Sequence, residues 1–353
     1  MKTTLKRLAL ATTLAIATTT SVTADAKPVL LKTPIAFGSN LPALGTPIVW
    51  VSEQLPLVSG GQLKMKIYEP GKLVAPLEIL DAVSSGKVNS GYSIAGYWAG
   101  KMPAAAIFST IPFGPEAPEF MAWMYYGNGL KLYQKMYDDA GYNVHVEPCA
   151  LISPETSGWF KKPVNSLDDL KGLNMRFYGL GGEVLAKLGV STSLIPGGEI
   201  FGALEKGAID ATEFSQPAID ERLGFYKVAK YNYFPGWHQQ ATFFELLINK
   251  SEWNGMDDSQ RAIISSVCKA SVTNSIAESE FIQYQSIRSN MEERGVTVNK
   301  WSPEMLKAFK TAWEEVVQEQ RKDPTFAAVY DDLHAFRENY KIWSSRAFVP
   351  REE

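Results

Sequence analysis

The most regular pattern of apolar and polar positions lies between residues 171 and 214, where short apolar runs alternate with helical segments. The spacing predicts strands at 174–178, 190–195 and 208–214 and helices at 183–188 and 199–206. Glycines follow both helices, where a left-handed residue commonly ends a helix. Strict alternation of this kind predicts a mostly parallel sheet with helices on its faces, in which ligands bind outside the carboxyl ends of the strands.

A second unit of the same kind occurs earlier in the chain. Residues 78–90 and 199–211 share the pattern E-I-x-x-A-[VL]-x-x-G-x-[VI]-[ND]-[SA], which describes a helix ended by glycine and followed by a strand. The sequence around the first copy predicts strands at 32–37, 63–68 and 87–93 and helices at 46–58 and 76–85. We therefore predict two lobes of similar α/β construction.

The remaining segments are mainly helical in pattern. They predict one helix over 119–140, strands at 142–149 and 241–249 that cross between the lobes, and one long helix over 257–294. At about 1.5 Å per residue, the long helix would exceed about 50 Å and span both lobes. Apolar residues at helical spacing predict its buried face: Ile263, Val267, Ala270, Ala277, Phe281, Tyr284 and Met291.

Two further helices begin at Ser302-Pro303 and Asp323-Pro324, each with a capping side chain followed by proline. The second of these continues to about Phe348 and carries many aromatic and aliphatic side chains. A terminal helix with so much apolar surface needs to be covered, either by this chain or by a partner subunit.

Composition and the N-terminus add the cellular context. The chain has 353 residues, 45% of them apolar, and a formal net charge of −3, which gives no support to a nucleic-acid partner. A short basic segment, an apolar run and the small residues around Ala24-Asp25-Ala26 predict a signal peptide at 1–26, cleaved near Ala24–Lys27. No later stretch reaches the roughly 18 apolar residues of a membrane span. Export permits a disulfide between Cys149 and Cys268, but two distant cysteines leave that pairing open.

Signatures of common enzyme classes are missing from the sequence. The chain contains no H-E-x-x-H, no C-x-x-C and no Walker loop. Its three histidines, His145, His238 and His334, lie far apart and show no metal-ligand spacing. We therefore expect a binding protein rather than an enzyme, with a secreted enzyme acting on small acids as the less favoured alternative.

Arg176 is the most informative candidate for ligand binding. It lies between Met175 and Phe177 near the carboxyl end of a predicted strand, and a guanidinium group recognises carboxylates in a planar, bidentate manner. The alternative is an ordinary ion pair between strands. Glu213 ends another predicted strand, where it is either part of the same site or a surface or hinge carboxylate.

Several segments together resemble a known family. The runs K-G-L-N-M-R-F and G-G-E-I-F-G-A-L-E-K-G-A-I-D-A-T-E-F resemble the solute-binding proteins of tripartite ATP-independent periplasmic (TRAP) transporters. The runs G-Y-W-A-G-K-x-P-A-A-A-x-F and L-G-F-Y-K-V-A-K-Y-N-Y-F-P-G-W are similar to the branch that binds 2-oxo and 2-hydroxy monocarboxylates. The resemblance extends from about Lys32 to Phe348 in order and without large gaps.

The resemblance implies a two-lobed periplasmic-binding-protein fold of the α/β class, with crossing strands, a long lobe-spanning helix and a C-terminal helical extension. The expected division of the chain follows in order: 1–26 signal peptide; 27–150 plus about 241–256 lobe I; 151–240 plus part of 296–322 lobe II; 257–295 long helix; 323–353 C-terminal dimerisation helix.

The resemblance also implies a set of site residues. Arg176 is expected to pair with the substrate carboxylate, and the other expected substrate contacts are Tyr97, Glu155, Phe214 and Asn40. A bridging Na⁺, or Ca²⁺, is expected at Glu155, Glu213, the carbonyl of Phe214 and Gln239. This chain departs from the branch, which usually has Trp at position 214, Gln at 155 and Glu at 239. The two carboxylates are kept but their places are exchanged.

The function implied is a periplasmic receptor that closes over a small organic acid and delivers it to the membrane permease subunits of a TRAP transporter. No catalytic cofactor is expected, and the C-terminal helix resembles one that joins two subunits into a homodimer. Three alternatives remain: a receptor for another solute (a sulfonate, dicarboxylate or polyol), a receptor that feeds a sensor kinase, and the secreted enzyme.

Overall fold

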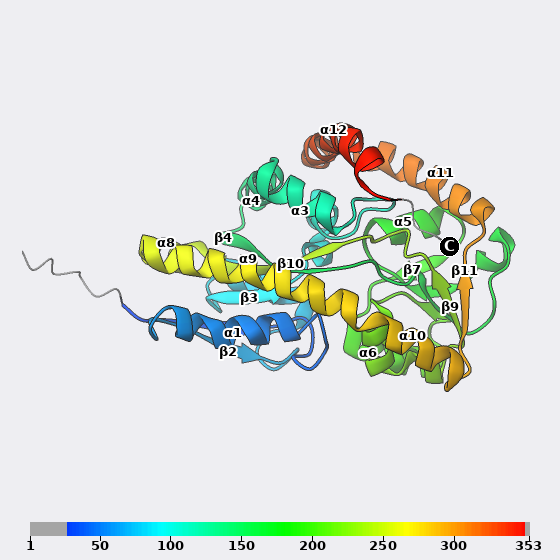
Figure 1. The fold of residues 1–353 in the computed structure, drawn as a ribbon, viewed down its shortest axis with the longest axis horizontal. Coiled ribbons are helices and arrows are strands. Elements are labelled where there is room, and N and C mark those ends of the chain that lie inside the picture. Colours follow the sequence, from blue (N-terminus) through cyan, green and yellow to red (C-terminus); the bar gives the residue numbers. More distant parts are fainter. Residues whose placement is uncertain (1–26, 350–353) are drawn as a thin grey trace, which may run out of the picture.

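The computed structural model describes residues 27–349, so the predicted signal peptide lies outside the described part of the chain. Two lobes lie side by side along the longest axis of the molecule, and the predicted two-lobed α/β fold is confirmed (Figure 1). We call lobe I the part built on strands β1 to β4 and β10, and lobe II the part built on the six-stranded sheet.

Lobe I contains two small sheets. Strands β1 (Val29–Pro34) and β2 (Leu63–Tyr68) pair in parallel, and α1 (Thr46–Val58) connects them. The second sheet has the order β3-β10-β4 and is antiparallel, with β3 (Ser90–Ser93), β10 (Thr242–Asn249) and β4 (Val144–Ile152). The predicted bounds of α1 and β2 agree with the structure, because both segments have a clear apolar period and end at glycines or polar residues.

Lobe II contains one sheet with the strand order β11-β9-β5-β8-β6-β7. The strands are β5 (Gly158–Phe160), β6 (Asn174–Arg176), β7 (Ser191–Ser193), β8 (Ala211–Thr212), β9 (Tyr231–Phe234) and β11 (Thr297–Lys300). Strand β6 pairs in parallel with both β7 and β8, and α5 (Gly179–Lys187) and α6 (Gly197–Glu205) make the connections. The parallel strand–helix alternation predicted for residues 171–214 is therefore confirmed.

The segment 119–140 forms two helices rather than the single one predicted. Helix α3 (Ala117–Tyr126) ends at Gly127, and α4 (Gly129–Asp139) begins two residues later. Gly127 has an extended backbone, and a Cβ atom there would lie 2.7 Å from the carbonyl oxygen of Trp123. The close approach of that carbonyl requires glycine and breaks the helix.

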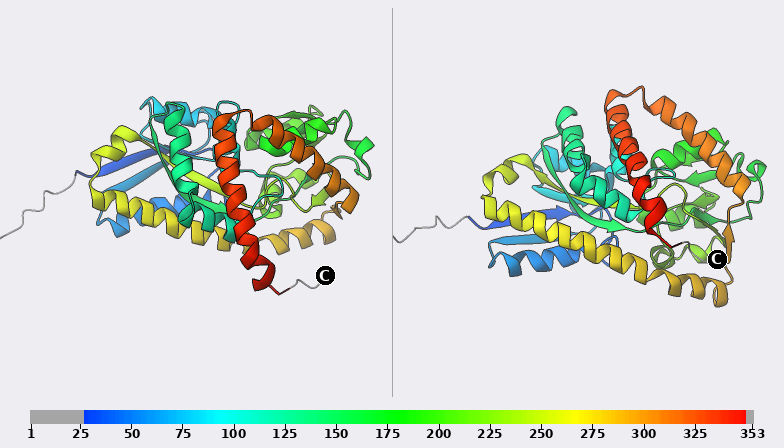
Figure 2. Two further views of the ribbon diagram at one scale, coloured as in Figure 1. Left: turned by 90° about the horizontal axis from the view of Figure 1, so that it is seen from above. Right: turned by 45° about the horizontal axis from the view of Figure 1, so that its top comes forward.

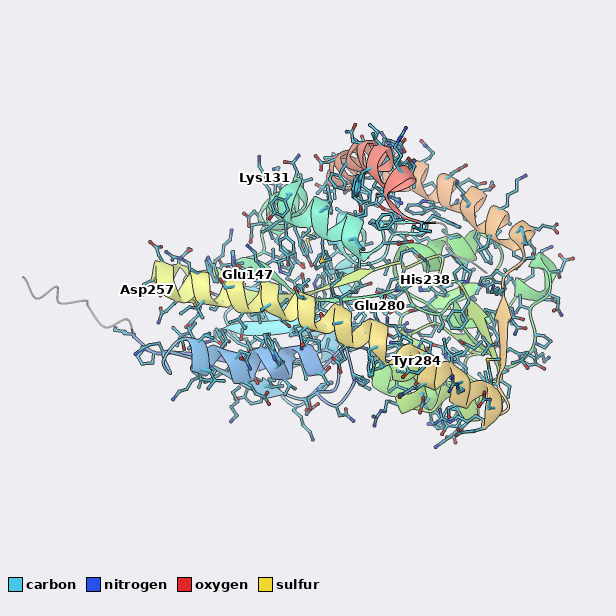
Figure 3. The ribbon with its side chains drawn as sticks, in the orientation of Figure 1. Lys131, Glu147, His238, Asp257, Glu280 and Tyr284 are labelled. Atoms are coloured by element: carbon cyan, nitrogen blue, oxygen red, sulfur yellow. A yellow bond between two sulfur atoms is a disulfide. The ribbon has the colours of Figure 1, made fainter. Side chains whose placement is uncertain are left out.

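The long helix is bent, and the predicted buried face was wrong for most of its residues, although Val267 is buried. Helix α9 (Asp258–Phe281) and helix α10 (Gln283–Glu292) meet at Ile282 and run along both lobes (Figures 1 and 3). Phe281, Tyr284 and Met291 are 66%, 52% and 55% exposed. The buried face keeps Val267 of the predicted stripe and otherwise combines aliphatic side chains with serines and a cysteine: Ile264, Cys268, Ser271, Val272, Ser275 and Ser279.

Small side chains bring α9 close to the crossing strand β4. The hydroxyl of Ser275 accepts from the amide of Leu151 at 2.9 Å and donates to the Leu151 carbonyl at 3.0 Å. Cys149 of β4 and Cys268 of α9 form a disulfide, which decides the pairing that the sequence left open. The helix is thus fixed to lobe I at its centre by hydroxyl contacts and one covalent bond.

Two C-terminal helices lie at the top of the view in Figure 1. Helix α11 (Pro303–Gln320) packs against α5 of lobe II, and α12 (Pro324–Ala347) lies over α3, α4 and the short helix η3 (Pro103–Phe108) of lobe I (Figures 1 and 2). Phe326, Val329 and Leu333 of α12 are buried against this chain. The far end of α12 is open, with Ile342 and Trp343 66% and 63% exposed. Within residues 27–349, no helix has the length and hydropathy of a membrane span.

Candidate functional site

Arg176 ends strand β6 and points inward, with only 1% of its surface exposed. Its Nε donates to the carbonyl of Ile195 at 3.1 Å, and its Nη1 donates to the carbonyl and to Oε2 of Glu213 at 2.6 and 2.8 Å. No described residue accepts a hydrogen bond from Nη2. Arg176 therefore makes the ion pair between strands and still keeps one nitrogen for another acceptor.

Arg176 also lines a small enclosed cavity between the lobes. The volume open to a water-sized sphere is only about 10 Å³, room for about one water molecule, so a ligand of several heavy atoms fits only when the lobes or side chains move. Both lobes contribute to its wall, which consists of Phe37, Leu44, Ile94, Tyr97, Glu155, Arg176, Tyr178, Phe214, Ser215, Gln239, Thr242 and Phe244. The guanidinium carbon of Arg176 lies 5.3 and 5.2 Å from the ring centres of Tyr178 and Phe214, so aromatic rings flank the positive charge.

A cluster of three buried ionisable groups lies beside the cavity. Nε2 of His238 lies 3.6 Å from Oε2 of Glu155 and 3.8 Å from Oε1 of Glu213. These atoms fall within 4.8 Å of one another, as in a metal site. Glu155 Oε2, Glu213 Oε1 and both ring nitrogens of His238 are buried without a hydrogen-bond partner. Buried polar atoms left unpaired in this way indicate a ligand or an ion.

The expectation that none of the histidines belongs to a metal-like cluster was wrong for His238. It lies on the loop between β9 and β10 within lobe II, while Glu155 follows β4 and Glu213 follows β8 (Figure 3). Spacing along the chain does not reveal a cluster whose members come from three separate segments. The available signal was its neighbour Gln239, which the resemblance had already placed in the site.

Burial and mutual contact shift the protonation of this cluster. Burial raises the pKa of Glu155 to about 8, with the negative charge of Glu213 adding to the rise and His238 opposing it. Burial would also raise the pKa of Glu213, but the positive charge of Arg176 and contact with His238 hold it below its usual value. Burial lowers the pKa of His238, but its contacts with the two carboxylates outweigh that effect and raise it.

The tyrosines set the polar edge of the cavity. The hydroxyl of Tyr178 donates to Oε1 of Gln239 at 3.0 Å, and the rings of Tyr97 and Tyr178 meet edge to face at 5.9 Å. Burial raises the pKa of Tyr97 to about 12, so its hydroxyl is a neutral hydrogen-bonding group. The cavity wall thus combines hydrogen-bond donors, aromatic faces and an acidic group.

The residues selected from the sequence have different positions in the structure. Tyr97, Glu155, Arg176, Phe214 and Gln239 line the same cavity. Glu213 is fully buried and reaches the cavity through its pairing with Arg176. Asn40 is exposed on the loop after β1 and is not among the lining residues. Conversely, the wall includes Tyr178, Ser215 and Thr242, which the sequence did not single out.

Comparisons with known proteins identify the family of this chain. The model of the family described as bacterial extracellular solute-binding protein, family 7 (DctP), matches residues 51–323. A monocarboxylate 2-oxoacid-binding periplasmic protein of Nostoc sp. is 34% identical over 295 residues, which cover 83% of this chain and 80% of that protein.

Two solved structures show the same fold. A TRAP transporter solute-binding protein of Bordetella bronchiseptica, a mixed-occupancy dimer with copurified calcium and picolinate, has a TM-score of 0.88 at 30% identity, covering 91% of this chain and 95% of that chain. A TRAP periplasmic solute-binding protein of Pseudoalteromonas atlantica with bound sodium and pyruvate has a TM-score of 0.86 at 31% identity, covering 91% and 97%. The resemblance seen in the sequence is confirmed, and the chain belongs to the DctP family of bacterial extracellular solute-binding proteins.

Proposed function

We propose that this protein is the periplasmic receptor of a TRAP transporter and that it captures a small monocarboxylate with a second oxygen on the α-carbon, such as a 2-oxo or 2-hydroxy acid. The observation that carries the proposal is the small cavity lined by both Arg176, whose Nη2 has no acceptor among the described residues, and Glu155, whose Oε2 is buried and unpaired. One positive and several acidic groups at one small cavity suit an acid bound together with a cation.

Arg176 is the proposed carboxylate anchor. Because Nε and Nη1 already donate to protein oxygens, the ligand carboxylate receives its hydrogen bonds from Nη2 rather than from both edges of the guanidinium group. The pairing with Glu213 keeps the side chain in place before the ligand arrives, which lowers the entropic cost of binding. The aromatic side chains Phe37, Phe214 and Phe244 leave little room beyond a short carbon chain.

The donor set fits a hard cation. Oε2 of Glu155, Oε1 of Glu213, the carbonyl of Phe214 and Oε1 of Gln239 are oxygen ligands of the kind that Na⁺ and Ca²⁺ prefer. Because burial raises the pKa of Glu155 to about 8, this carboxyl group holds a proton near neutral pH when no cation is bound. A cation held there would replace that proton, balance the charge of the ligand carboxylate and take the second oxygen of the acid. The bound calcium and sodium of the two related structures support this assignment.

Both lobes contribute side chains to the cavity wall, so capture requires the lobes to close around the ligand. In the proposed function, the closed form is the one that the membrane permease subunits recognise after export of the receptor to the periplasm. Binding and release need no covalent step, and we propose that the protein is not an enzyme. The division into lobe I (27–150 plus about 241–256) and lobe II (151–240 plus part of 296–322) is part of the same proposal, as is a homodimer formed through residues 323–353.

The test is thermal unfolding and calorimetric titration of the mature, ligand-stripped protein with a panel of acids. The panel contains pyruvate, lactate, a dicarboxylate, a sulfonate and a polyol, each with Na⁺, with Ca²⁺ and with a chelator. A ligand at a hundred times its dissociation constant stabilises the native state by about 2.7 kcal/mol, a shift that is easily seen. Pyruvate or lactate is expected to produce it, and the chelator is expected to reduce it.

Two variants sharpen the result. Arg176→Lys keeps the charge but loses the planar fork, so ligand binding should weaken by about tenfold or more. Arg294→Lys is the matched control. Arg294 forms an ion pair with Glu221, with 2.7 Å between the two charged atoms, and it does not line the cavity. Stabilisation by only sulfonates, dicarboxylates or polyols would refute the substrate class, and equal binding by the Arg176→Lys variant would refute the anchor.

A further inference from the structure

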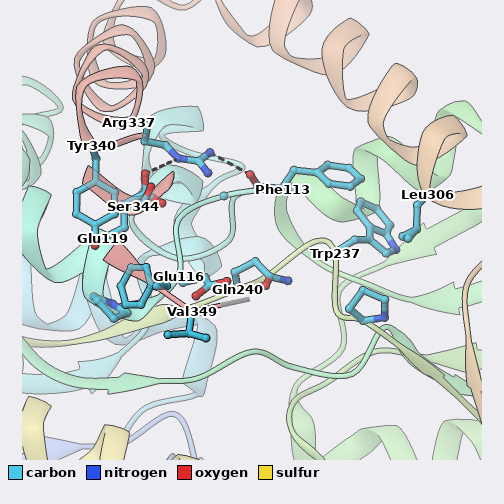
Figure 4. A pocket seen from close by; sticks show the side chains of 14 residues that line it. Phe113, Glu116, Glu119, Trp237, Gln240, Leu306, Arg337, Tyr340, Ser344 and Val349 are labelled. Atoms are coloured by element: carbon cyan, nitrogen blue, oxygen red, sulfur yellow. Dashed lines mark hydrogen bonds and ion pairs between the residues drawn. The ribbon is translucent and has the colours of Figure 1, made fainter. Parts of the chain in front are cut away.

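We call residues 235–241, between β9 and β10, the binding loop. A second, larger cleft of about 860 Å³ lies between this loop and helix α12. Its wall includes Phe113, Glu119 and Trp237 together with Arg337 and Tyr340 of α12 (Figure 4). Trp237 directly precedes His238, which belongs to the buried cluster beside the ligand cavity, and Gln239, which lines the cavity. The cleft therefore separates α12 from the loop that completes the site, and one chain of contacts joins them.

Arg337 begins that chain. Its Nε donates to Oε1 of Glu119 at 3.1 Å, and its Nη1 donates to the carbonyl of Phe113 at 3.0 Å, as Figure 4 shows. The side chains of Arg337 and Glu119 are only 27% and 13% exposed, so solvent screens this pair weakly. A charged donor on a backbone carbonyl is among the stronger hydrogen bonds of a protein.

Phe113 passes the contact on to the binding loop. Its amide donates to the carbonyl of Trp237 at 2.7 Å, and its ring stacks on Trp237 with 5.8 Å between the ring centres. Phe113 has a φ of 54°, a backbone conformation that costs an aromatic residue free energy and persists only where surrounding contacts hold it. Arg337 and Trp237 supply those contacts from its two sides.

The loop itself has few alternatives to this position. Gly236 lies so close to Glu155 that a Cβ atom would be 2.1 Å from the Glu155 carbonyl oxygen. The amide of Glu155 donates to the carbonyl of Gln239 at 3.3 Å, which ties two proposed cation ligands together. A shift of Trp237 would therefore move His238, Gln239 and Glu155 relative to Arg176.

We propose that Arg337 of the C-terminal helix is a positioning residue for ligand binding, acting through Phe113 and Trp237 on the loop that carries His238 and Gln239. The inference rests on the proposed function for its ligand, but the positioning itself concerns this chain alone. In this proposal the packing of α12 influences the affinity for the ligand, although α12 contributes no residue to the wall of the ligand cavity.

The experiment compares Arg337→Met with the wild-type protein in two measurements. Calorimetry gives the dissociation constant for pyruvate with Ca²⁺, and hydrogen exchange gives the protection of the Phe113 and Gln239 amides without ligand. We expect binding to weaken by about tenfold, the loss of one hydrogen bond from a charged group. Both amides are expected to exchange faster, because the Phe113 carbonyl loses its donor.

Three further variants separate positioning from simple stability. Arg346→Met is the matched control on the same helix. Within the described part of the chain, Arg346 donates hydrogen bonds to its own helix, to the Ile342 carbonyl and to the Ser345 hydroxyl. This control variant should leave affinity and exchange unchanged. Arg337→Lys keeps a charged donor and should recover part of the affinity. Glu119→Gln keeps the bond from Arg337 to Phe113 and should give a smaller effect in the same direction.

The outcomes are distinct. A lower melting temperature of Arg337→Met with unchanged affinity and unchanged exchange at Phe113 and Gln239 would overturn the inference, because Arg337 would then only attach α12. If the wild-type protein binds none of the acids, the proposed substrate class fails, and faster exchange at the two amides still supports the positioning role. If the two amides of Arg337→Met then exchange at the same rate as in the wild-type protein, the positioning role is overturned as well.

Discussion

Replacement of Arg176 by methionine separates the two roles of this residue, the ion pair and the ligand anchor. Methionine keeps much of the side-chain volume but removes three hydrogen bonds, two of them to Glu213. Glu213 is fully buried and its Oε1 already lacks a partner, so the variant leaves an uncompensated buried carboxylate. Breaking a buried ion pair from one side costs about 3–5 kcal/mol.

The double variant Arg176→Met/Glu213→Gln tests that explanation. Removing both charges takes away the uncompensated carboxylate, so most of the lost stability should return. The measurement is the free energy of unfolding from urea denaturation of the ligand-free proteins. Both variants should also lose stabilisation by ligand, since neither contains the proposed anchor.

Two results would refute this reasoning. If the single variant loses less than about 1 kcal/mol, the pair behaves as a solvent-exposed one and the buried geometry is wrong. If the double variant is as unstable as the single one, the cost comes from lost packing rather than from the charge of Glu213. Ligand binding retained by the double variant would place the anchor elsewhere.

Two other predictions concern residues outside the cavity. Burial raises the pKa of Asp220 well above its usual value, so the native state holds a proton that the unfolded chain loses as pH rises. The stability of Asp220→Asn relative to wild type should therefore rise by up to about 1.4 kcal/mol per pH unit above pH 4. The measurement is denaturation from pH 4 to 8, and a difference in stability that does not change with pH would contradict this prediction. The disulfide closes a loop with a sequence separation of 119, so the double variant Cys149→Ser/Cys268→Ser should lose about 2–5 kcal/mol of its free energy of unfolding. Its stability should no longer depend on added reductant. A double variant as stable as the wild-type protein would refute a stabilising role of the disulfide.

Much of the local structure follows from short segments of sequence. The caps of α11 and α12 are an example, because Ser302 accepts from the amide of Met305 and Asp323 accepts from the amide of Phe326, as a capping residue followed by proline predicts. The alternation in 171–214 likewise predicts that its strands are parallel, since a strand, a helical crossover and a second strand of the same sheet form a parallel unit. In the structure β6 pairs in parallel with β7 and with β8. Family membership also followed from motifs of the sequence.

The composition of the site depended on the tertiary structure. Glu155, Glu213 and His238 come from three segments, and only the tertiary packing of those segments brings their side chains within 4.8 Å of one another. Asn40, which the resemblance implied as a ligand contact, is exposed and is not among the lining residues, so its role stays a prediction.

The long helix shows the same division between local and tertiary causes. Its existence followed from helical spacing, but its buried face did not follow from hydrophobicity. The face turned to β4 includes serines and Cys268 beside aliphatic residues, because small side chains allow close approach and the hydroxyl of Ser275 bonds to strand backbone. Sequence determined which segments are helices and strands, since capping and periodicity are local; the partners of each buried polar group were decided by packing, since they lie far apart along the chain.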